Sequence, residues 1–353
     1  KLGTISDVLI GEFIHQKLQK PNGKYPVYNG GVSNTGYYDK FNRNEDKIII
    51  SARGENAGYV NKVTRKFWSG NSCYTINLKS ERIHWLYLYF YLRHNYLFNL
   101  KARQEATIPS VSKKDVSNLI IKCPKNNEQK AIAETLMTFD RHIENLERLI
   151  EKKKMIRDGA VEDLMTGKTR LDGFEDKWEE VKLGTISDVL IGEFIHQKLQ
   201  KPNGKYPVYN GGVSNTGYYD KFNRNEDKII ISARGENAGY VNKVTRKFWS
   251  GNSCYTINLK SERIHWLYLY FYLRHNYLFN LKARQEATIP SVSKKDVSNL
   301  IIKCPKNNEQ KAIASILTAM DNEIEDLEKE KAKIEKIKVG AMDDLLTGSV
   351  RLI

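Results

Sequence analysis

The sequence has few cysteines, and none of them stands in a metal-binding or disulfide pattern. Its four cysteines are two positions, Cys73 and Cys123, that recur as Cys254 and Cys304. No pair has the C-x-x-C spacing, so a zinc site or a disulfide framework is not expected. Long apolar runs are also missing, since Trp85 to Leu92 is the longest and is too short to span a bilayer. With no signal peptide visible, we expect a cytoplasmic protein.

The signatures of several enzyme classes are absent as well. The phosphate-binding loop G-x-x-x-x-G-K-[ST] does not occur. There is no Pro-Pro pair, whereas an adenine methyltransferase needs an N/D-P-P-Y/F tetrapeptide and a glycine-rich cofactor loop. The histidines show no metal-ligand spacing, and Asp39, Glu45, Asp46 and Glu55 lie in basic loops, where acids usually pair with lysine. We expect no catalytic residues, no metal and no cofactor in this chain.

Positive charge is plentiful but confined to two segments. The formal net charge is +15, and residues 1–133 and 182–314 each contribute +11. The intervening and final segments, 134–181 and 315–353, carry −4 and −3. Basic globular modules beside slightly acidic segments indicate a polyanionic partner, and nucleic acid is the partner that we expect.

These two basic segments are copies of one another. Residues 1–133 are identical to residues 182–314 at every position. Beyond them the halves agree only at scattered positions, including Thr166-Gly167 and Thr347-Gly348. The pattern indicates a recent copy of one module into an older two-fold framework, and natural or laboratory copying would both produce it.

A long amphipathic helix is predicted after each module, at Glu128 to Leu164 and at Glu309 to Leu345. Its apolar residues step by three and four, as in the seam of a coiled coil, so each helix is the natural partner of the other. Asn126 with Gln129 is expected to cap the first helix, and Gly167 to end it. The seam residues are Ile132, Leu136, Phe139, Ile143, Leu146, Ile150, Ile313, Leu317, Met320, Ile324, Leu327 and Ile334.

Within each module the pattern predicts strands, a tight turn and one helix. The helix is expected at Glu81 to about Asn99 with Ser80 as its cap, although the Leu/Tyr alternation inside it also fits a strand. Apolar runs bounded by turn residues predict strands at Ile48–Ser51, Tyr59–Val63 and Tyr74–Leu78, and a turn at Gly54–Gly58.

Three polar stretches are candidates for contact with DNA bases. Arg53 and Asn56 flank a turn that can present a guanidinium and an amide to base edges, or that is a structural hairpin in which Arg53 pairs with Glu55. The loop Asn29 to Tyr38 fits either a groove contact or a solvent loop, and the stretch around Thr107 fits either base contact or a solvated linker. The base-contact candidates are Asn34, Thr35, Arg53, Asn56, Arg103, Gln104, Asn215, Thr216, Arg234, Asn237, Arg284 and Gln285.

Other cations in loops are candidates for phosphate contact, because lysines placed there give affinity without a base code. The phosphate-contact candidates are Lys17, Lys20, Lys24, Lys62, Arg65, Lys66, Lys113, Lys114, Lys198, Lys201, Lys205, Lys243, Arg246, Lys247, Lys294 and Lys295.

Three stretches together carry a family resemblance. They are I-K-C-P-K-N-N-E-Q-K-A-I-A at 121–133, the ending L-M-T-G at 164–167, and the restart W-E-E-V-K-L-G at 178–184. With the seam helix, they resemble the specificity subunit of type I restriction-modification systems over essentially the whole chain. The resemblance implies a DNA-reading subunit that holds two methyltransferase subunits, where S-adenosylmethionine is expected, and restriction subunits in the full complex.

We therefore expect an α+β fold in which two mixed α/β target recognition domains are joined by two long antiparallel coiled-coil helices, with pseudo-two-fold symmetry. The expected divisions are 1–125 (first recognition domain), 126–166 (first helix), 167–181 (linker), 182–306 (second recognition domain), 307–347 (second helix) and 348–353 (tail).

The sequence departs from the family pattern in two ways. Its recognition domains are identical, where the family normally carries different ones, which predicts an interrupted palindromic DNA site. It also begins at Lys1 without the W-x-x-V lead-in that precedes Lys182, which suggests a trimmed N-terminus. The alternatives are a stand-alone bipartite DNA-binding regulator or architectural protein, and a coiled-coil scaffold, against which the basic modules argue.

Overall fold

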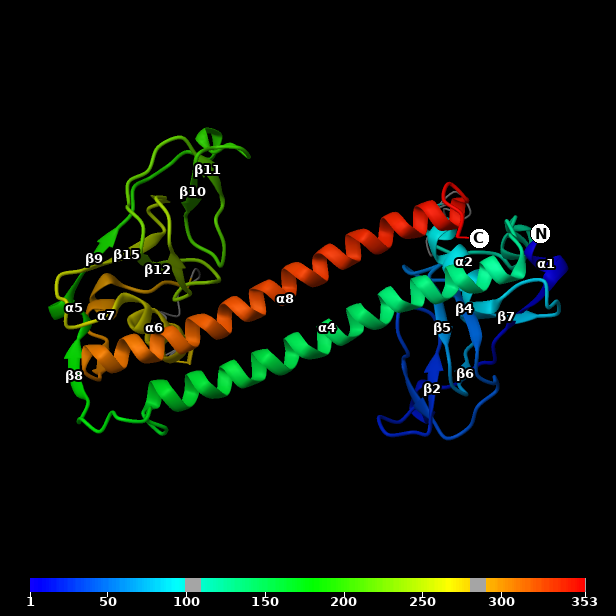
Figure 1. The fold of residues 1–353 in the computed structure, drawn as a ribbon, viewed down its shortest axis with the longest axis horizontal. Helices are drawn as coiled ribbons and strands as arrows, with labels where there is room; N and C mark the ends of the chain where they lie inside the picture. The colour runs from blue at the N-terminus through cyan, green and yellow to red at the C-terminus, as the bar shows by residue number, and fades with distance from the viewer. Residues whose placement is uncertain (99–108, 280–289, 353) are drawn as a thin grey trace. The chain divides into compact units, whose positions relative to one another are not determined.

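The computed structural model describes residues 1–98, 109–279 and 290–352, and the chain divides into two compact units (Figure 1). The first unit comprises Lys1–Glu147 and Lys329–Ile353, and the second comprises Arg148–Glu328. Each unit therefore holds one module, the first part of the helix that follows it, and the last part of the other long helix. The module core in each unit includes residues of both helices.

A four-stranded antiparallel sheet lies at the centre of the first unit. In order, its strands are β1 (Ser6–Ile10), β7 (Cys73–Leu78), β4 (Lys47–Ser51) and β5 (Val60–Val63). Three consecutive isoleucines fill β4 because both of its faces are covered. Ile48 and Ile50 belong to the main core with the helices, and Ile49 belongs to a smaller cluster around Phe67. A strand buried on both faces shows no polar alternation, and the strand predicted here is confirmed.

The remaining elements of the module surround this sheet. One side carries a small sheet in the order β3-β2-β6, in which β2 pairs antiparallel with β3 and parallel with β6. The bounds are α1 (Leu2–Ile5), η1 (Gln16–Leu18), β2 (Tyr25–Tyr28), β3 (Gly36–Tyr38), β6 (Trp68–Ser69), α2 (Trp85–Phe98) and α3 (Lys113–Asn118).

The apolar stretch after residue 80 is a helix, as predicted, but it begins later than expected. The hydroxyl of Ser80 accepts a hydrogen bond from the Arg82 amide at 3.2 Å, which forms a turn, and α2 starts only at Trp85. The predicted cap at Ser80 is therefore wrong. Tyr87, Leu88 and Phe90 are almost fully buried, and a helix buried on most sides loses the polar stripe that marks a surface helix.

The two long helices, α4 (Asn126–Thr166) and α8 (Asn307–Thr347), are 41 residues each and pair antiparallel within each unit. In the first unit Asp140 contacts Lys338, and Glu147 lies 2.8 Å from Lys331. In the second unit Lys153 contacts Glu323 at 2.7 Å, and Arg157 contacts Asp321 at 2.8 Å. In these pairs the residue number in α8 falls as the residue number in α4 rises, which confirms the antiparallel pairing.

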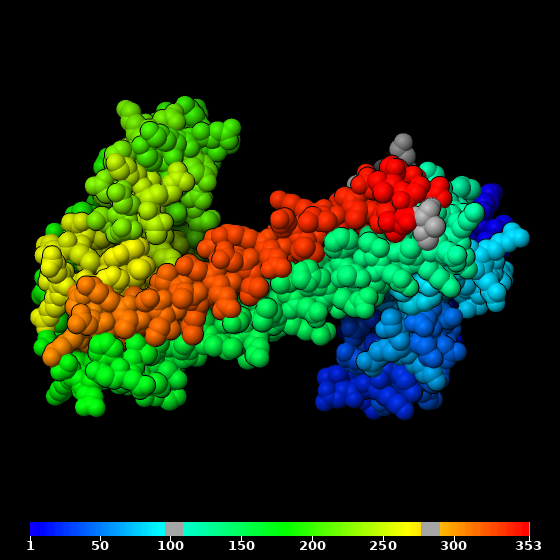
Figure 2. Space-filling view, in the orientation of Figure 1, coloured from blue at the N-terminus to red at the C-terminus, as the bar shows by residue number. Residues whose placement is uncertain are grey.

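The seam residues have a second partner besides the facing helix. Ile132 and Leu136 pack in one cluster with α2, the sheet, and Met342, Leu345 and Leu346 of α8. Figure 2 shows the last part of α8, in red, against the first part of α4. All twelve predicted seam positions are buried or half-buried. The first turns of each long helix are thus part of the hydrophobic core of the module that precedes it.

The start of α4 differs from the predicted capping box. The Asn126 amide donates to the Glu81 carbonyl at 3.1 Å instead of capping the helix. Gln129 is fully buried, donates to the carbonyls of Arg82 (2.9 Å) and Pro124 (2.8 Å), and accepts from the His84 amide at 2.8 Å. These bonds tie the helix start to the segment before α2. The predicted stop is confirmed, since Gly167 has φ +74°.

The second unit repeats this topology with one addition. A two-stranded antiparallel sheet joins the linker strand β8 (Glu179–Lys182) to β16 (Ile301–Cys304), and residues 120–123, the copy of β16, are not a strand in the first unit. Its other elements are α5 (Leu183–Ile186), β9 (Ser187–Ile191), η3 (Gln197–Leu199), β10 (Tyr206–Tyr209), β11 (Gly217–Tyr219), β12 (Lys228–Ser232), β13 (Val241–Val244), β14 (Trp249–Ser250), β15 (Cys254–Leu259), α6 (Trp266–Phe279) and α7 (Lys294–Ser298). Among the described residues, none of these helices is long and apolar enough to cross a membrane.

Candidate nucleic-acid interface

Arg53 and Asn56 lie exposed on a turn that backbone hydrogen bonds hold rigidly. The chain leaves β4 at Ser51, and the Gly54 amide donates to the Pro109 carbonyl at 2.8 Å. Gly54 has φ +90°, and its carbonyl accepts from the Ala57 amide at 2.9 Å. The turn thus has its own backbone hydrogen bonds, and the Arg53 side chain is exposed on it. The second unit repeats the turn at Arg234 and Asn237, with Gly235 at φ +92°.

Side-chain hydrogen bonds hold the Asn29–Tyr38 loop, one within the loop and one to Gln19 before it. Two successive glycines, Gly30 and Gly31, have φ of +90° and +92°. The Asn34 amide donates to the Gly36 carbonyl at 3.2 Å, and the Thr35 hydroxyl donates to the Gln19 side chain at 3.0 Å. Asn34 and Thr35 thus shape the loop, and their copies Asn215 and Thr216 make the same bonds.

The structure brings this loop and the Arg53 turn together. The Ser51 hydroxyl, at the end of β4, donates to the Gly31 carbonyl at 3.0 Å. A side chain at Gly30 would place its Cβ 3.6 Å from the Arg53 carbonyl oxygen. Two of the three predicted base-contact stretches therefore form one surface. The third, with Arg103, Gln104 and Thr107 and the copies Arg284 and Gln285, lies outside the described residues.

A basic and aromatic surface lies on the same module. Lys24 is 5.3 Å from the Tyr25 ring centroid, Lys66 is 4.7 Å from the Phe41 centroid, and these two rings are 5.0 Å apart. The Arg65 guanidinium donates to the Lys24 carbonyl at 2.9 Å. We call these five residues the basic-aromatic patch. Its rings were not among the predicted contacts, although aromatics between lysines are a signal for nucleic-acid binding.

The other exposed phosphate candidates have different surroundings. Lys113 and Lys114 occupy the first turn of α3, which a capping box of Ser112 and Asp115 anchors. Lys20 pairs with Asp39 at 2.6 Å, and the bond to Asp39 raises the pKa of Lys20. Lys17 is exposed beside η1. The candidates at Lys198, Lys201, Lys205, Arg246, Lys247, Lys294 and Lys295 repeat these placements in the second unit.

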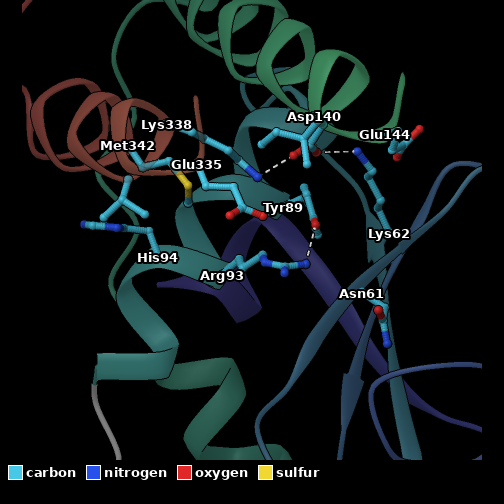
Figure 3. Close-up of a pocket in the computed structure, with 12 residues that line it drawn as sticks. Asn61, Lys62, Tyr89, Arg93, His94, Asp140, Glu144, Glu335, Lys338 and Met342 are labelled. Carbon is cyan, nitrogen blue, oxygen red and sulfur yellow. Dashed lines mark hydrogen bonds and ion pairs between the residues drawn. The ribbon is translucent and has the colours of Figure 1, made fainter. Parts of the chain in front are cut away.

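Lys62 stands apart, because it joins the module to the long helices. Its ammonium lies 2.7 Å from Asp140, which also pairs with Lys338, and 5.3 Å from the Tyr89 ring (Figure 3). Burial disfavours the charged form of Asp140, but the hydrogen bonds from Lys338 and Lys62 outweigh it and hold its pKa below the ordinary value. In the second unit Asp321 lies between Arg157 at 2.8 Å and Lys243 at 3.7 Å.

A pocket of about 580 Å³ opens beside this junction in the first unit. It is lined from β5, α2 and both long helices by side chains that include Arg93, His94, Glu144, Glu335 and Met342 (Figure 3). Charges of both signs line it, and Arg93 donates to the Tyr89 hydroxyl at 2.8 Å. The pocket is therefore part of the polar interface between the module and the two long helices. In the described part of the chain, no group of three His, Cys, Asp or Glu side chains is placed to hold a metal ion.

Comparisons with known proteins agree with this architecture. The family described as type I restriction modification DNA specificity domain matches residues 1–153 and 175–336. The MjaVIII specificity subunit, of a type I restriction enzyme of Methanocaldococcus jannaschii, is 28% identical over 98% of this chain and 92% of its own length. The crystal structure of a type I restriction-modification S subunit from Mycoplasma genitalium has a TM-score of 0.79 and 26% identity, covering 98% of this chain and 94% of that one.

Proposed function

Because the chain belongs to the type I restriction modification DNA specificity family, we propose that it recognises a bipartite DNA site through its two modules. The observation that carries this proposal is that the family match covers both copies, each with an exposed arginine turn beside a glycine-rich loop. The recognition domains would be residues 1–125 and 182–306. Each module, with its charge of +11, would add phosphate contacts from the basic-aromatic patch and from α3 or α7.

The two half-sites are proposed to be identical and inverted. Identical modules read identical base sequences, and α4 and α8 run in opposite directions where they pair. A two-fold relation in the protein is mirrored in the DNA, which gives an interrupted palindrome. The bases between the half-sites are left unread.

The long helices are proposed to set that spacing. Adding seven residues to both helices at facing positions, after Glu147 and after Glu330, preserves the heptad register, since Glu147 pairs with Lys331. It lengthens each helix by about 10 Å, which corresponds to about three base pairs at roughly 3.4 Å each. Unchanged half-sites with a longer spacer would support the proposal, and an unchanged spacer would contradict it.

Catalysis is assigned to partners. Methyltransferase subunits, which would bind S-adenosylmethionine, modify one adenine in each half-site, and restriction subunits cut unmodified DNA in the cytoplasm. The test is methyl transfer to DNA by the purified chain, by a methyltransferase partner, and by the two together. Transfer that requires both proteins supports the assignment. Transfer by this chain alone, or by the partner alone at the same sites, contradicts it.

A further inference from the structure

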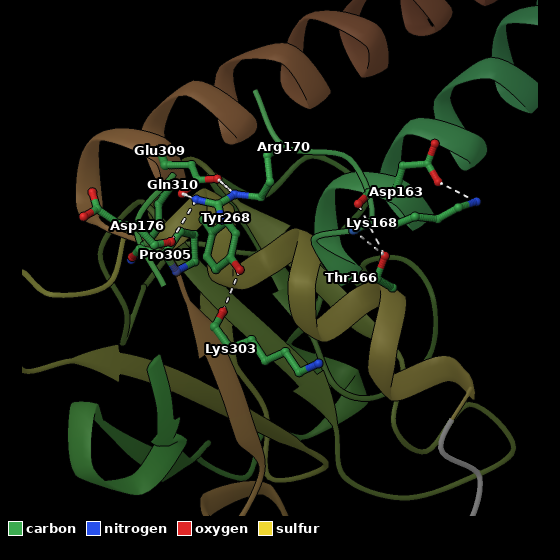
Figure 4. Close-up of polar contacts among 10 residues, drawn as sticks. All are labelled: Asp163, Thr166, Lys168, Arg170, Asp176, Tyr268, Lys303, Pro305, Glu309 and Gln310. Carbon is green, nitrogen blue, oxygen red and sulfur yellow. Dashed lines mark hydrogen bonds and ion pairs between the residues drawn. The ribbon is translucent and has the colours of Figure 1, made fainter. Parts of the chain in front are cut away.

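In each module one phenylalanine ring lies mostly in solvent. Phe13 is 63% exposed, and its copy Phe194 is 65% exposed. Most other aromatic side chains are far better covered, such as Tyr268, which is 0% exposed and donates from its hydroxyl to the Lys303 carbonyl at 2.6 Å (Figure 4). Among the side chains whose burial is described, Phe41 is the next most exposed aromatic residue of the first module, at 40%.

Phe13 has exposed apolar neighbours in the chain. Ile10 is 51% exposed and Leu18 is 50% exposed. In the second module, which follows the strand β8, their copies Ile191 and Leu199 are 49% and 50% exposed. The exposure of this segment therefore does not depend on what precedes the module. Single exposed apolar residues are ordinary on a protein surface, but several in one segment indicate an interaction site.

This segment leaves the central sheet at the same end as the Arg53 turn. Strands β1 and β4 both pair antiparallel with β7, and their last residues, Ile10 and Ser51, lie opposite the first two residues of β7. The chain then continues from β1 into the segment that holds Phe13, and from β4 into the Arg53 turn. The exposed ring is thus on a segment that starts beside a predicted base-contact stretch.

Hydrogen bonds hold the segment at both ends. The Glu12 amide donates to the Ser69 carbonyl at 2.8 Å, and the Gln19 side chain accepts from the Thr35 hydroxyl at 3.0 Å. The second bond joins the segment to the Asn29–Tyr38 loop, which is another predicted base-contact stretch. The second module repeats both bonds, at 2.8 and 2.9 Å.

A second ring supports the phenylalanine. The ring centroids of Phe13 and His15 are 4.9 Å apart and their planes are inclined by 79°. The copies Phe194 and His196 have a centroid distance of 5.3 Å and an angle of 77°. Edge-to-face packing of this kind is a favoured arrangement of aromatic rings. The histidine therefore helps to fix an exposed ring that lies outside any helix or strand.

The surroundings of this ring indicate duplex DNA as its partner. The module carries a charge of +11 and belongs to a family of DNA specificity domains. Its segment adjoins two predicted base-contact stretches, through the end of β1 and through Gln19. The apolar surfaces of a duplex are the faces of its bases, which become accessible where two base pairs separate. Proteins reach these faces with apolar wedges such as Phe, Leu or Ile.

We propose, on the basis of the proposed function, that Phe13 and Phe194 each insert between two adjacent base pairs at or beside a half-site. Insertion unstacks that base step and bends the duplex. The free-energy cost depends on which two base pairs are separated, because base steps differ in how readily they unstack. Each module thereby reads a base step through its deformability, in addition to the hydrogen bonds of Arg53 or Arg234.

The test measures binding of the full chain, purified with its methyltransferase partner, to duplexes that carry its mapped site with a mismatch at one base step. The mismatch is placed at the same step of both half-sites, and each step is tested in turn. A mismatch lowers the cost of unstacking at its own step. A side chain that inserts there therefore binds the mismatched DNA more tightly, whereas a side chain that only touches a base edge gains nothing.

For the parent chain we expect one step at which the mismatch tightens binding by about tenfold. Phe13→Ala combined with Phe194→Ala should remove this gain, and the corresponding double change to Leu should keep most of it, because Leu is also a wedge residue. Both copies are changed together because either module can occupy either half-site. In the fully paired site, 2-aminopurine next to that step should brighten when the parent chain binds and stay quenched with the double Ala variant.

A matched control shows that the effect belongs to this ring. Met155 is 70% exposed on α4, outside the modules, and Met155→Ala should behave as the parent chain in both measurements. The midpoint of urea unfolding should be the same for the parent chain and all variants, because the substituted side chains are exposed. Binding to the fully paired site should persist in the double Ala variant, since its arginine turns and lysines are intact.

Two results would overturn the proposal. The first is that at no base step does the gain from a mismatch depend on Phe13 and Phe194. The second is that 2-aminopurine brightens equally with the parent chain and the double Ala variant, which would mean that another group separates the bases. In both cases specific binding by the parent chain leaves the proposed function intact. A parent chain that prefers no DNA sequence would contradict the proposed function and this inference together.

Discussion

The two modules are one sequence in two settings, and their differences lie where they meet other parts of the chain. The central isoleucines have the same burial in both copies, with Ile50 and Ile231 at 0%. Cys123 and Cys304, at the edge, do not. The central strand of a module is thus packed alike in both copies, whereas the exposure of its edge depends on the strand placed against it.

The joints to the long helices show the same dependence. Asp140 lies between two lysines, Lys62 and Lys338. Its copy Asp321 lies between Arg157 and a more distant Lys243. The module supplies the same lysine in both units. The second cation beside the aspartate comes from the other long helix, and it is Lys338 in the first unit and Arg157 in the second. The same substitution can be made in both copies. Effects that agree come from contacts within the module, and effects that differ come from contacts with the long helices.

The largest effect is expected in the shared core. Leu136→Ala and Leu317→Ala each remove a side chain that is fully buried. Each should lower the free energy of unfolding by about 2 to 5 kcal/mol, because a cavity remains. The two values should agree, since both leucines pack into a module core. Urea unfolding measures both, and a decrease of less than about 1 kcal/mol for either would contradict the packing of that helix against its module.

Base discrimination should depend equally on the two arginine turns. Arg53→Ala and Arg234→Ala should each relax one half-site by about 1 to 3 kcal/mol, the worth of a bidentate hydrogen bond to a base. Competition binding with single-base variants of the site measures the change. Lys79→Ala, a change at an exposed lysine paired with Asp7, is the control. Discrimination that survives the double change would make the Arg53 turn purely structural.

The ion pairs of Asp140 and Asp321 should contribute less to the free energy of unfolding, and the two should contribute unequally. Asp140→Asn should lower the free energy of unfolding by about 1 to 3 kcal/mol, because two lysines lose a charged acceptor. The folded pKa of Asp140 is lowered, so its contribution is complete above the unfolded pKa of about 3.9 and disappears as pH falls through the folded pKa. The variant and the parent should therefore converge in acid. A constant difference across that pH range would contradict the ion pair, and Asp321→Asn is the matched comparison.

The smallest effect per residue is expected for the lysines of α3 and α7. Replacing Lys113, Lys114, Lys294 and Lys295 by Gln should weaken binding to all DNA sequences alike. The slope of log K against log salt should become shallower by about 0.9 for each phosphate that the protein no longer neutralises. Changing only one pair should give half of that reduction. An unchanged slope would remove these lysines from the interface.

The sequence predicted an element correctly where neighbouring residues alone determine its conformation. The isoleucine run of β4, the seam of α4 and the glycine stop at Gly167 could all be predicted from neighbouring residues. The contacts at the start of α4 could not, because the partners of Gln129 include Arg82 and His84, which lie more than forty positions earlier. The late start of α2 at Trp85 follows from the same contacts.

Predictions about the candidate surface divide in the same way. An arginine at the end of a strand identified the Arg53 turn, and clustered glycines identified the Asn29–Tyr38 loop. That the two lie together through Ser51 could be seen only in the structure. Lys62 resembles the other loop lysines in sequence, and only the structure shows that Asp140 lies beside it. The pairing of β8 with β16 was missed because Trp178–Lys182 has no apolar alternation long enough to predict a strand.

The claim that two identical modules read one half-site in opposite directions has a direct test. The chain is co-expressed with a methyltransferase partner, and methylated adenines are mapped across the DNA of those cells by single-molecule sequencing. The account predicts one motif, in which a short half-site, a fixed spacer of unread bases and the inverted half-site follow one another. Two unrelated half-sites, or the same half-site in direct repeat, would contradict it.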